Sequence, residues 1–324
     1  MAPLRNAAGD YQAEIASELS GQRLDQALVQ CFPEFSRARL QRWVRDGQVQ
    51  VDGAVVDKPR LAVAEGQILT LHAETEAEVG WQAQDIPLEV VHADASILVI
   101  NKPAGIVVHP AAGNHDGTLV NALLHYDPAL AEVPRAGIVH RLDKDTSGLL
   151  VVARTLQAQA SLVRQLQART VSREYLALVQ GMLVAGGTVD APLGRHPVDR
   201  KRMAVVGNGR EAITHYRVNT RYRVHTLIDV KLETGRTHQI RVHMAHVGHP
   251  LVGDPVYGGR ARLPKQATPE LVDALQGFRR QALHARRLEL EHPESGEWLS
   301  WEAPIPDDFA ALLTLLQADL QAHS

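Results

Sequence analysis

The sequence predicts a mixed α+β fold, in which a larger domain with a largely antiparallel sheet follows a smaller N-terminal domain. Short apolar strands dominate, and the helices stand between hairpins without repeated long strand–helix units. The chain has 324 residues, 45% hydrophobic and 22% charged, which suffices for two domains with separate cores. The predicted divisions are a loose leader at 1–15, a small domain at 16–72, an acidic linker at 73–88 and the larger domain at 89–324.

The composition excludes several classes of protein. The longest apolar runs fall far short of the roughly 20 residues that span a bilayer, and the N-terminus lacks the apolar segment of a secretory signal. Cys31 is the only cysteine, which excludes intrachain disulfides and cysteine-based zinc sites. The net charge of −3 argues against a strongly basic binder, and the 28 Arg against 6 Lys suit either RNA binding or a GC-rich coding sequence. We expect a cytoplasmic protein.

The small domain reads as two helices followed by a small sheet. Four apolar residues are spaced for one face of the first helix: Leu24, Ala27, Leu28 and Cys31. Ser36 is a suitable N-cap for a second helix over 37–45. Asp52-Gly53 predicts a hairpin between strands at 49–51 and 54–56, and a last strand is expected at 68–71.

The second predicted helix carries four arginines with no acidic residue among them: Arg37, Arg39, Arg42 and Arg45. The last three recur every third residue and so share roughly one face, which is either a solvated surface or an RNA contact. The order of RLDQAL, the arginine helix, GQVQVDGAVVDKP and GQI resembles the S4 RNA-binding domain. That resemblance implies that these four arginines bind RNA. The stretch that follows, with Glu74, Glu76 and Glu78, gives the acidic linker.

The larger domain is predicted from its apolar runs. Strands are expected at 97–100, 106–108, 148–153, 174–180, 216–218, 223–232 and 282–290. Helices are expected at 155–168 and 237–247. The segments 111–136 and 194–211 are rich in Gly, Pro, His and Arg, and we expect surface loops there.

A polar loop, HRLDKDTSG at 140–148, lies between two apolar strands. Such a loop holds side chains on a rigid platform, as catalytic groups require. Asp143 and Asp145 are its carboxylates, and either could act as a base or nucleophile. The alternative is a solvated hairpin loop with an internal Arg–Asp pair.

A second segment, at 232–259, combines arginines with a run of histidines. Arg236 and Arg241 flank the start of the predicted helix, which Thr237 could cap, and a buried arginine there would need a carboxylate such as Asp143. The histidines invite a metal site: His238, His243, His246 and His249. They form no HExxH pattern and have few carboxylates nearby, so we expect hydrogen-bonded histidines and no metal.

The motifs HRLDKDTSG, SREYLALVQG and TGRTHQIRVHMAHVGHPLVGDPVYGG together resemble the RluA family of pseudouridine synthases, and INKPAGIVVHP resembles that family's first motif. The resemblance covers nearly the whole chain. It implies an isomerase with the pseudouridine synthase fold, which converts uridine in RNA to pseudouridine without a cofactor or metal. The family's essential aspartate falls on Asp143, as a nucleophile at C1′ or as a base on the sugar.

The same resemblance implies roles for other residues. Arg241 is the basic partner of Asp143, Tyr175 stacks on the target uracil, and Arg141 inserts into the RNA when the base leaves its stack. Arg236 supports the site or a phosphate. The charge of one loop also suggests phosphate contacts: Arg195, Arg200, Lys201 and Arg202.

The runs DIPL and NALLHY bring the likeness closest to synthases that modify large-subunit ribosomal RNA. The implied target is the helix 69 stem-loop of 23S RNA, and the expected partner is that RNA or a precursor of the large ribosomal subunit. A monomer is expected. The alternatives are a synthase for other ribosomal or transfer RNA uridines, a non-catalytic RNA-binding or ribosome-assembly protein, and a metal-dependent hydrolase that uses the histidines.

Overall fold

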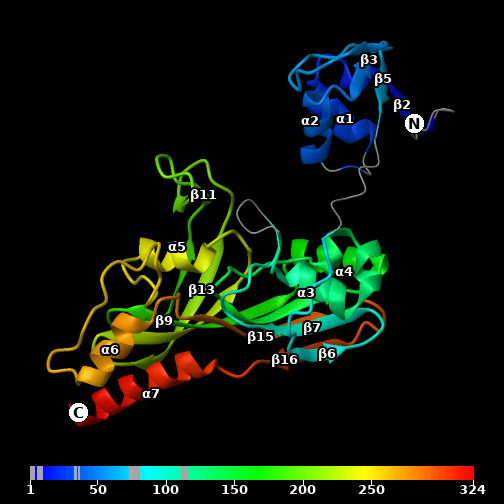
Figure 1. Cartoon of the computed structure of the whole chain (residues 1–324). Helices are drawn as coiled ribbons and strands as arrows, with labels where there is room; N and C mark the ends of the chain where they lie inside the picture. The colour runs from blue at the N-terminus through cyan, green and yellow to red at the C-terminus, as the bar shows by residue number, and fades with distance from the viewer. Residues whose placement is uncertain (1–3, 6–9, 33–34, 36, 73–80, 111–115) are drawn as a thin grey trace. The chain divides into compact units, whose positions relative to one another are not determined.

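The computed structural model describes residues 4–5, 10–32, 35, 37–72, 81–110 and 116–324 (Figure 1). The chain divides into two compact units, Met1–Gly80 and Trp81–Ser324. The expected linker at 73–88 is split by this division, because 73–80 lie outside the described residues while Gln84 bonds to Asn121 and Gly117 of the second unit. None of the helices in the described part of the chain has the length and apolar content that a membrane span requires.

The first unit packs two helices, α1 and α2, on an antiparallel sheet with the order β1-β2-β5-β3-β4. Its elements are β1 (Leu4–Arg5), β2 (Tyr11–Glu14), the short 3-10 helix η1 (Ser17–Leu19), α1 (Leu24–Cys31), α2 (Arg37–Arg45), β3 (Val49–Val51), β4 (Ala54–Val55) and β5 (Ile68–Leu71). The predicted inner face of α1 is confirmed, since Leu24, Ala27, Leu28 and Cys31 are buried. The cap expected at Ser36 lies outside the described residues.

The expectation of a loose leader at 1–15 is wrong for residues 11–14. Strand β2 pairs antiparallel with β5, and the Tyr11 ring contacts Phe32 and Phe35 edge-on. The segment YQAE is too short and too polar to signal a strand by itself. The strand is held by hydrogen bonds to its partner β5, and the sequence of the segment does not predict such pairing.

The second unit contains a nine-stranded sheet with the order β10-β13-β14-β9-β15-β8-β7-β6, and β16 pairs with β15. Neighbouring strands are antiparallel except for β8 and β15, which run parallel. This arrangement confirms the predicted mixed, largely antiparallel fold. The sheet strands are β6 (Val90–Ala93), β7 (Ile97–Lys102), β8 (Ser147–Ala153), β9 (Ser172–Gln180), β10 (Gly187–Asp190), β13 (Ile213–Arg221), β14 (His225–Leu232), β15 (Leu283–Glu291) and β16 (Trp298–Glu302).

Alternation along β9 assigns its side chains to two cores. Tyr175, Ala177 and Val179 pack with residues of α3 (Leu119–Tyr126) and α5 (Gln239–His246). The residues between them, Leu176 and Leu178, pack with α6 (Pro269–Gly277) and α7 (Asp307–Ala322). Because successive side chains of a strand point to opposite faces, Tyr175 lies on the α5 side of the sheet.

Three expectations for the second unit need correction. No strand forms at 106–108, where the chain has no regular secondary structure and bends at Val108. The segment 111–136 contains the buried helix α3, followed by 3-10 helices η2 (Pro128–Glu132) and η3 (Pro134–Gly137). The segment 194–211 contains a hairpin of β11 (Leu193–Arg195) and β12 (Met203–Val205). The helix expected at 155–168 is present as α4 (Leu156–Gln167).

Candidate active site

The polar loop at 140–148 is tied down by neighbouring segments. Lys102 Nζ and the Gly105 N–H both donate to the carbonyl of Lys144, each at 3.0 Å. Gln281 Nε2 donates to the Thr146 side chain, at Oγ1, at 2.9 Å. Both anchored residues follow Asp143 in the loop, so structure outside the loop helps to hold the carboxylate in place.

Lys102 is a wholly buried cation under this loop, with 0% of its surface exposed. Its ammonium also donates to the carbonyls of Pro103 at 2.7 Å and Ile106 at 3.1 Å. Burial lowers the pKa of Lys102 to about 8, although the carboxylates of Asp145 and Asp143 act to raise it.

Asp143 lies at one end of a line of charges with Arg241 and Asp254. Arg241 Nη1 donates to Asp143 Oδ2 at 3.1 Å, while its Nε and Nη2 donate to the two oxygens of Asp254 at 2.7 and 2.9 Å. Burial would lower the pKa of Arg241, but the two carboxylates raise it well above its ordinary value. Burial likewise acts to raise the pKa of Asp254, and the bonds from Arg241 more than reverse this. The guanidinium therefore stays charged and orients Asp143.

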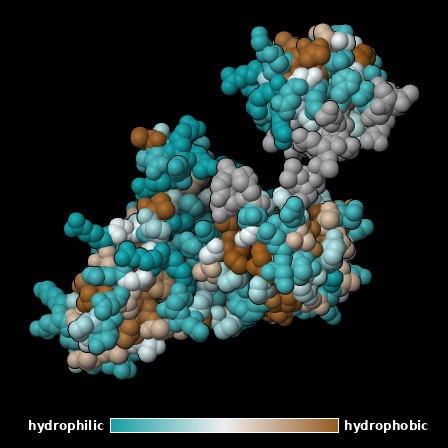
Figure 2. All heavy atoms as spheres, viewed as in Figure 1, coloured by the Kyte–Doolittle hydropathy of each residue, from teal (hydrophilic) through white to brown (hydrophobic). Residues whose placement is uncertain are grey.

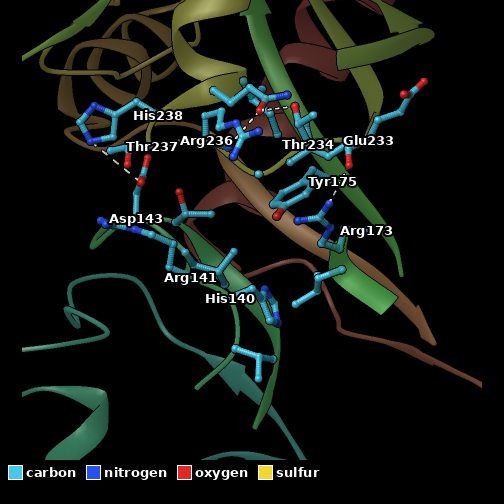
Figure 3. A pocket seen from close by; sticks show the side chains of 18 of the residues that line it. His140, Arg141, Asp143, Arg173, Tyr175, Glu233, Thr234, Arg236, Thr237 and His238 are labelled. Atoms are coloured by element: carbon cyan, nitrogen blue, oxygen red, sulfur yellow. Dashed lines mark hydrogen bonds and ion pairs between the residues drawn. The ribbon is translucent and has the colours of Figure 1, made fainter. Parts of the chain in front are cut away.

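A cavity of about 450 Å³ opens beside Asp143 (Figure 3). The predicted residues Arg141, Asp143, Tyr175, Arg236 and Arg241 all line it, whereas Asp145 does not. Its size lies within the range of sites for small ligands and single nucleotides. Of the two carboxylates in the loop, Asp143 is thus the one that borders the cavity.

Tyr175 forms part of the cavity wall and has only 6% of its surface exposed. Burial raises the pKa of its hydroxyl, which therefore keeps its proton at neutral pH. Figure 3 shows the ring next to Arg173 and Thr234. Arg141 is exposed, and Arg236 donates from Nε to the Glu211 carbonyl at 2.9 Å.

The sequence analysis missed four residues of this neighbourhood: Lys102, Asp254, His238 as a neighbour of Asp143, and Tyr257. His238 Nε2 lies 3.9 Å from Asp143 Oδ1, and its Nδ1 lies 2.9 Å from the Tyr257 hydroxyl. Asp254 and Tyr257 stand in the run GDPVYGG, just after the histidines. The signal for Asp254 was available, since a buried arginine shared with Asp143 has donors for a second carboxylate.

The start of α5 differs from the expectation. Its N-cap is His238 and not Thr237, and no side chain bonds the cap. Gln239 instead holds the segment that precedes the helix, because its Oε1 accepts from the Arg236 N–H at 3.0 Å.

The histidine run shows protein hydrogen bonds. Both ring nitrogens of His243 lie 2.9 Å from protein oxygens, on Thr214 and Ala191, and His249 Nδ1 lies 2.9 Å from the Gln180 carbonyl. Among the described residues, no group of three histidines, cysteines or carboxylates has metal-binding geometry. Both ring nitrogens of His243 already have hydrogen-bond partners in the protein, which disfavours their use as metal ligands in the hydrolase alternative.

The N-terminal arginines have different surroundings. Arg37 is tied to the buried Asp25 at 3.0 Å, and Arg42 lies 3.4 Å from Asp46. The side chain of Arg39 lies outside the described residues. Arg45 is exposed and lines a shallow hollow whose other cations are Arg23, Lys58 and Arg60. The hollow also contains one carboxylate, Asp57, so Arg45 lies where four cations surround a single acidic side chain.

Comparison with known proteins identifies two family models and several relatives that match this chain. The RNA pseudouridylate synthase family model matches residues 96–246, and the S4 domain model matches residues 22–69. The ribosomal large subunit pseudouridine synthase D of Pseudomonas aeruginosa is 62% identical over 310 residues, which cover 96% of this chain and 97% of that protein. The synthase of the same name from Escherichia coli K12 is 55% identical over 311 residues, or 96% of this chain and 95% of that one.

Solved structures show the same catalytic fold. Human RNA pseudouridylate synthase domain containing 4 superposes with a TM-score of 0.55 at 26% identity, over 71% of this chain and 93% of that one. Human RNA pseudouridylate synthase domain containing 1 superposes with a TM-score of 0.53 at 26% identity, over 73% and 97%.

Proposed function

Because this chain belongs to the RNA pseudouridylate synthase family, we propose that it isomerises uridines to pseudouridine in large-subunit ribosomal RNA, with Asp143 as the catalytic residue. The observation that carries the proposal is the Asp143 carboxylate, held by Arg241 at 3.1 Å on the wall of a cavity that Tyr175 also lines. The relatives named as ribosomal large subunit pseudouridine synthase D, which align over 96% of the chain, support the substrate class.

The proposed reaction breaks the N1–C1′ bond of uridine and forms a C5–C1′ bond, after which the C5 proton is lost and N1 takes one up. Substrate and product are isomers, so the chemistry needs no oxidant, reductant or group donor. Asp143 acts at the sugar, either as a nucleophile at C1′ or as a base that removes a sugar proton. In both routes the carboxylate acts as the ionised group, and the hydrogen bond from Arg241 at 3.1 Å fixes its orientation.

The target base must leave its stack to reach Asp143. The Tyr175 ring in the cavity wall supports stacking of the uracil, and base–aromatic stacking contributes about 1–3 kcal/mol. Arg141 is exposed on the same loop as Asp143, where it can enter the space that the base vacates. Arg236 at the cavity supports a phosphate contact.

The proposed target is the helix 69 stem-loop of 23S RNA, met as free RNA or in a precursor of the large subunit. The S4 domain supports this choice of a structured RNA, because it adds a second binding surface outside the catalytic unit. We place the activity in the cytoplasm with its ribosomal substrate and expect the protein to act as a monomer.

Release of tritium from uridine C5 tests the function and the target together. Full-length 23S RNA labelled at C5 and the same RNA without helix 69 are compared, followed by assembled large subunits. We expect release from the intact RNA and none from the RNA that lacks helix 69. Release that survives the deletion would keep the reaction but move the target to another uridine. The absence of release from every substrate would favour a non-catalytic role in ribosome assembly.

A further inference from the structure

We infer that His238, oriented by Tyr257, is a positioning residue for Asp143 that presents its Nε2–H to the carboxylate oxygen facing away from Arg241. This inference rests on the proposed function, because Asp143 is the group through which His238 acts. The proposed roles of His238 and Tyr257 are additional to the ion pair between Asp143 and Arg241.

The two oxygens of Asp143 have different neighbours. Oδ2 accepts from Arg241 at 3.1 Å, whereas Oδ1 faces His238 Nε2 at 3.9 Å (Figure 3). A hydrogen bond requires about 2.7–3.2 Å, so a movement of roughly 1 Å would complete this one. Catalytic hydrogen bonds are commonly long in a free enzyme and shorten when substrate binds. His238 is thus placed to fix the plane of the carboxylate once RNA fills the cavity.

The hydrogen bonds of Tyr257 determine which nitrogen of His238 carries the proton. Its hydroxyl oxygen accepts from the Met203 N–H at 2.9 Å and lies 2.9 Å from His238 Nδ1. Burial raises the pKa of Tyr257, so the hydroxyl keeps a proton that it can donate to Nδ1. Burial also lowers the pKa of His238, against the pull of Asp143, which leaves the ring neutral. A neutral ring that accepts at Nδ1 carries its proton on Nε2, toward Asp143.

The backbone conformation of His238 is independent evidence that the imidazole has a function at this position. With φ at 57° and ψ at 22° it occupies the left-handed region, which costs a residue with a Cβ of order 1–3 kcal/mol. Asparagine or glycine would adopt this conformation more readily. The imidazole makes no capping bond to offset the strain, and its contacts are with Tyr257 and Asp143.

Tyr257 also connects this pair to the β11–β12 hairpin. The guanidinium carbons of Arg202 and Arg241 lie 5.2 and 5.1 Å from its ring centre. Figure 2 shows the lobe with this hairpin covered largely by hydrophilic residues. Tyr257→Phe would keep the ring and both cation contacts while removing the hydroxyl, and with it the hydrogen bonds to His238 and to the Met203 N–H.

The test measures single-turnover tritium release at saturating 23S RNA, and separately the Kd for that RNA, using the full chain. His238→Asn suits the left-handed backbone but ends near the Nδ1 position, too short for Asp143. We expect it to lower the rate about 10- to 100-fold with Kd within about twofold. His238→Gln places an amide nitrogen near the Nε2 position and should restore part of the loss. Tyr257→Phe should lower the rate by about fivefold to tenfold.

Two outcomes would overturn the inference. One is an unchanged rate in His238→Asn, and the other is a loss confined to Kd, which would make His238 an RNA contact only. A thermal melt of His238→Asn at or above the wild-type midpoint excludes misfolding as the cause of a lower rate.

The tautomer gives a readout that needs no RNA. The ¹⁵N spectrum of histidine-labelled protein, assigned with His238→Asn, should show Nε2 protonated and Nδ1 bare, and Tyr257→Phe should shift this balance. A proton on Nδ1 would contradict the inference. If wild-type protein releases no tritium from any RNA, the proposed function fails, while this spectrum still decides the placement of the proton.

Discussion

A single arginine serves two carboxylates in the candidate site, and its planar donors make that possible. Arg241 gives Nε and Nη2 to Asp254 and keeps Nη1 for Asp143. Lysine has one ammonium and could not hold Asp254 at two points while reaching Asp143. Asp254 therefore fixes the direction of the guanidinium, and through it the position of Asp143.

Lys102 gives a prediction on pH. Its pKa is about 8 in the folded protein, against an ordinary 10.5. Between these values the unfolded chain holds more protons, so this lysine makes stability rise with pH across the window. Lys102→Met should remove that rise, which amounts to about 3 kcal/mol over the whole window and to about 2 kcal/mol between pH 7.5 and pH 10.

Urea unfolding at pH 7.5 and at pH 10 measures this change in the free energy of unfolding. Lys144→Met, which replaces an exposed lysine of the loop at 140–148 above Lys102, is the matched control and should follow the wild-type pH dependence. A Lys102→Met protein with the same pH dependence as wild type would show that the buried ammonium is not destabilised by its surroundings.

At the scale of elements, the parallel contact between β8 and β15 depends on one glycine. Gly148 has φ at 113°, and a Cβ there would overlap the backbone of Ala285. We predict that Gly148→Ala lowers the free energy of unfolding by about 3 kcal/mol. Gly277→Ala, at the end of α6 with nothing within 4 Å, should change it by less than about 1 kcal/mol. Equal urea midpoints for the two variants would contradict this account.

The elements that sequence patterns predicted well are those with a clear period or cap. The helix at 37–45 and the strands at 49–51 and 68–71 match α2, β3 and β5 residue for residue. Helix α3 was missed because residues 119–124 are buried on every side, which removes the amphipathic period. Its capping box between Thr118 and Asn121 was the signal that remained.

The site was predictable only in part. Asp143 and Arg241 lie 98 positions apart, and their pairing was expected because a buried arginine needs a carboxylate. The placement of His238 depends on a left-handed backbone turn before α5, which no residue type in that segment announces. Tyr257 reaches the site through the tertiary fold alone.

For the whole molecule, the division into two units predicts a separation of binding from chemistry. Arg45 and Lys58 line the basic hollow of the first unit, whereas all the residues that line the catalytic cavity belong to the second unit. Arg45→Gln with Lys58→Gln should raise KM for RNA about tenfold, leave kcat unchanged and lower the slope of log Kd against log salt by about 1–2.

The matched control is Arg217→Gln, which removes one exposed charge on β13 outside both the hollow and the cavity. It should leave KM within about twofold. A fall in kcat with unchanged KM in the Arg45/Lys58 variant would contradict the division of labour.

The most direct test of the central claim compares two isosteric substitutions in one loop, Asp143→Asn and Asp145→Asn. Both keep the shape of the side chain and remove one negative charge, but only Asp143 borders the cavity. Tritium release from C5-labelled 23S RNA is measured at saturating RNA. We predict that Asp143→Asn releases none while still binding the RNA, and that Asp145→Asn stays within about tenfold of wild type. Release by Asp143→Asn at the wild-type rate would contradict the account.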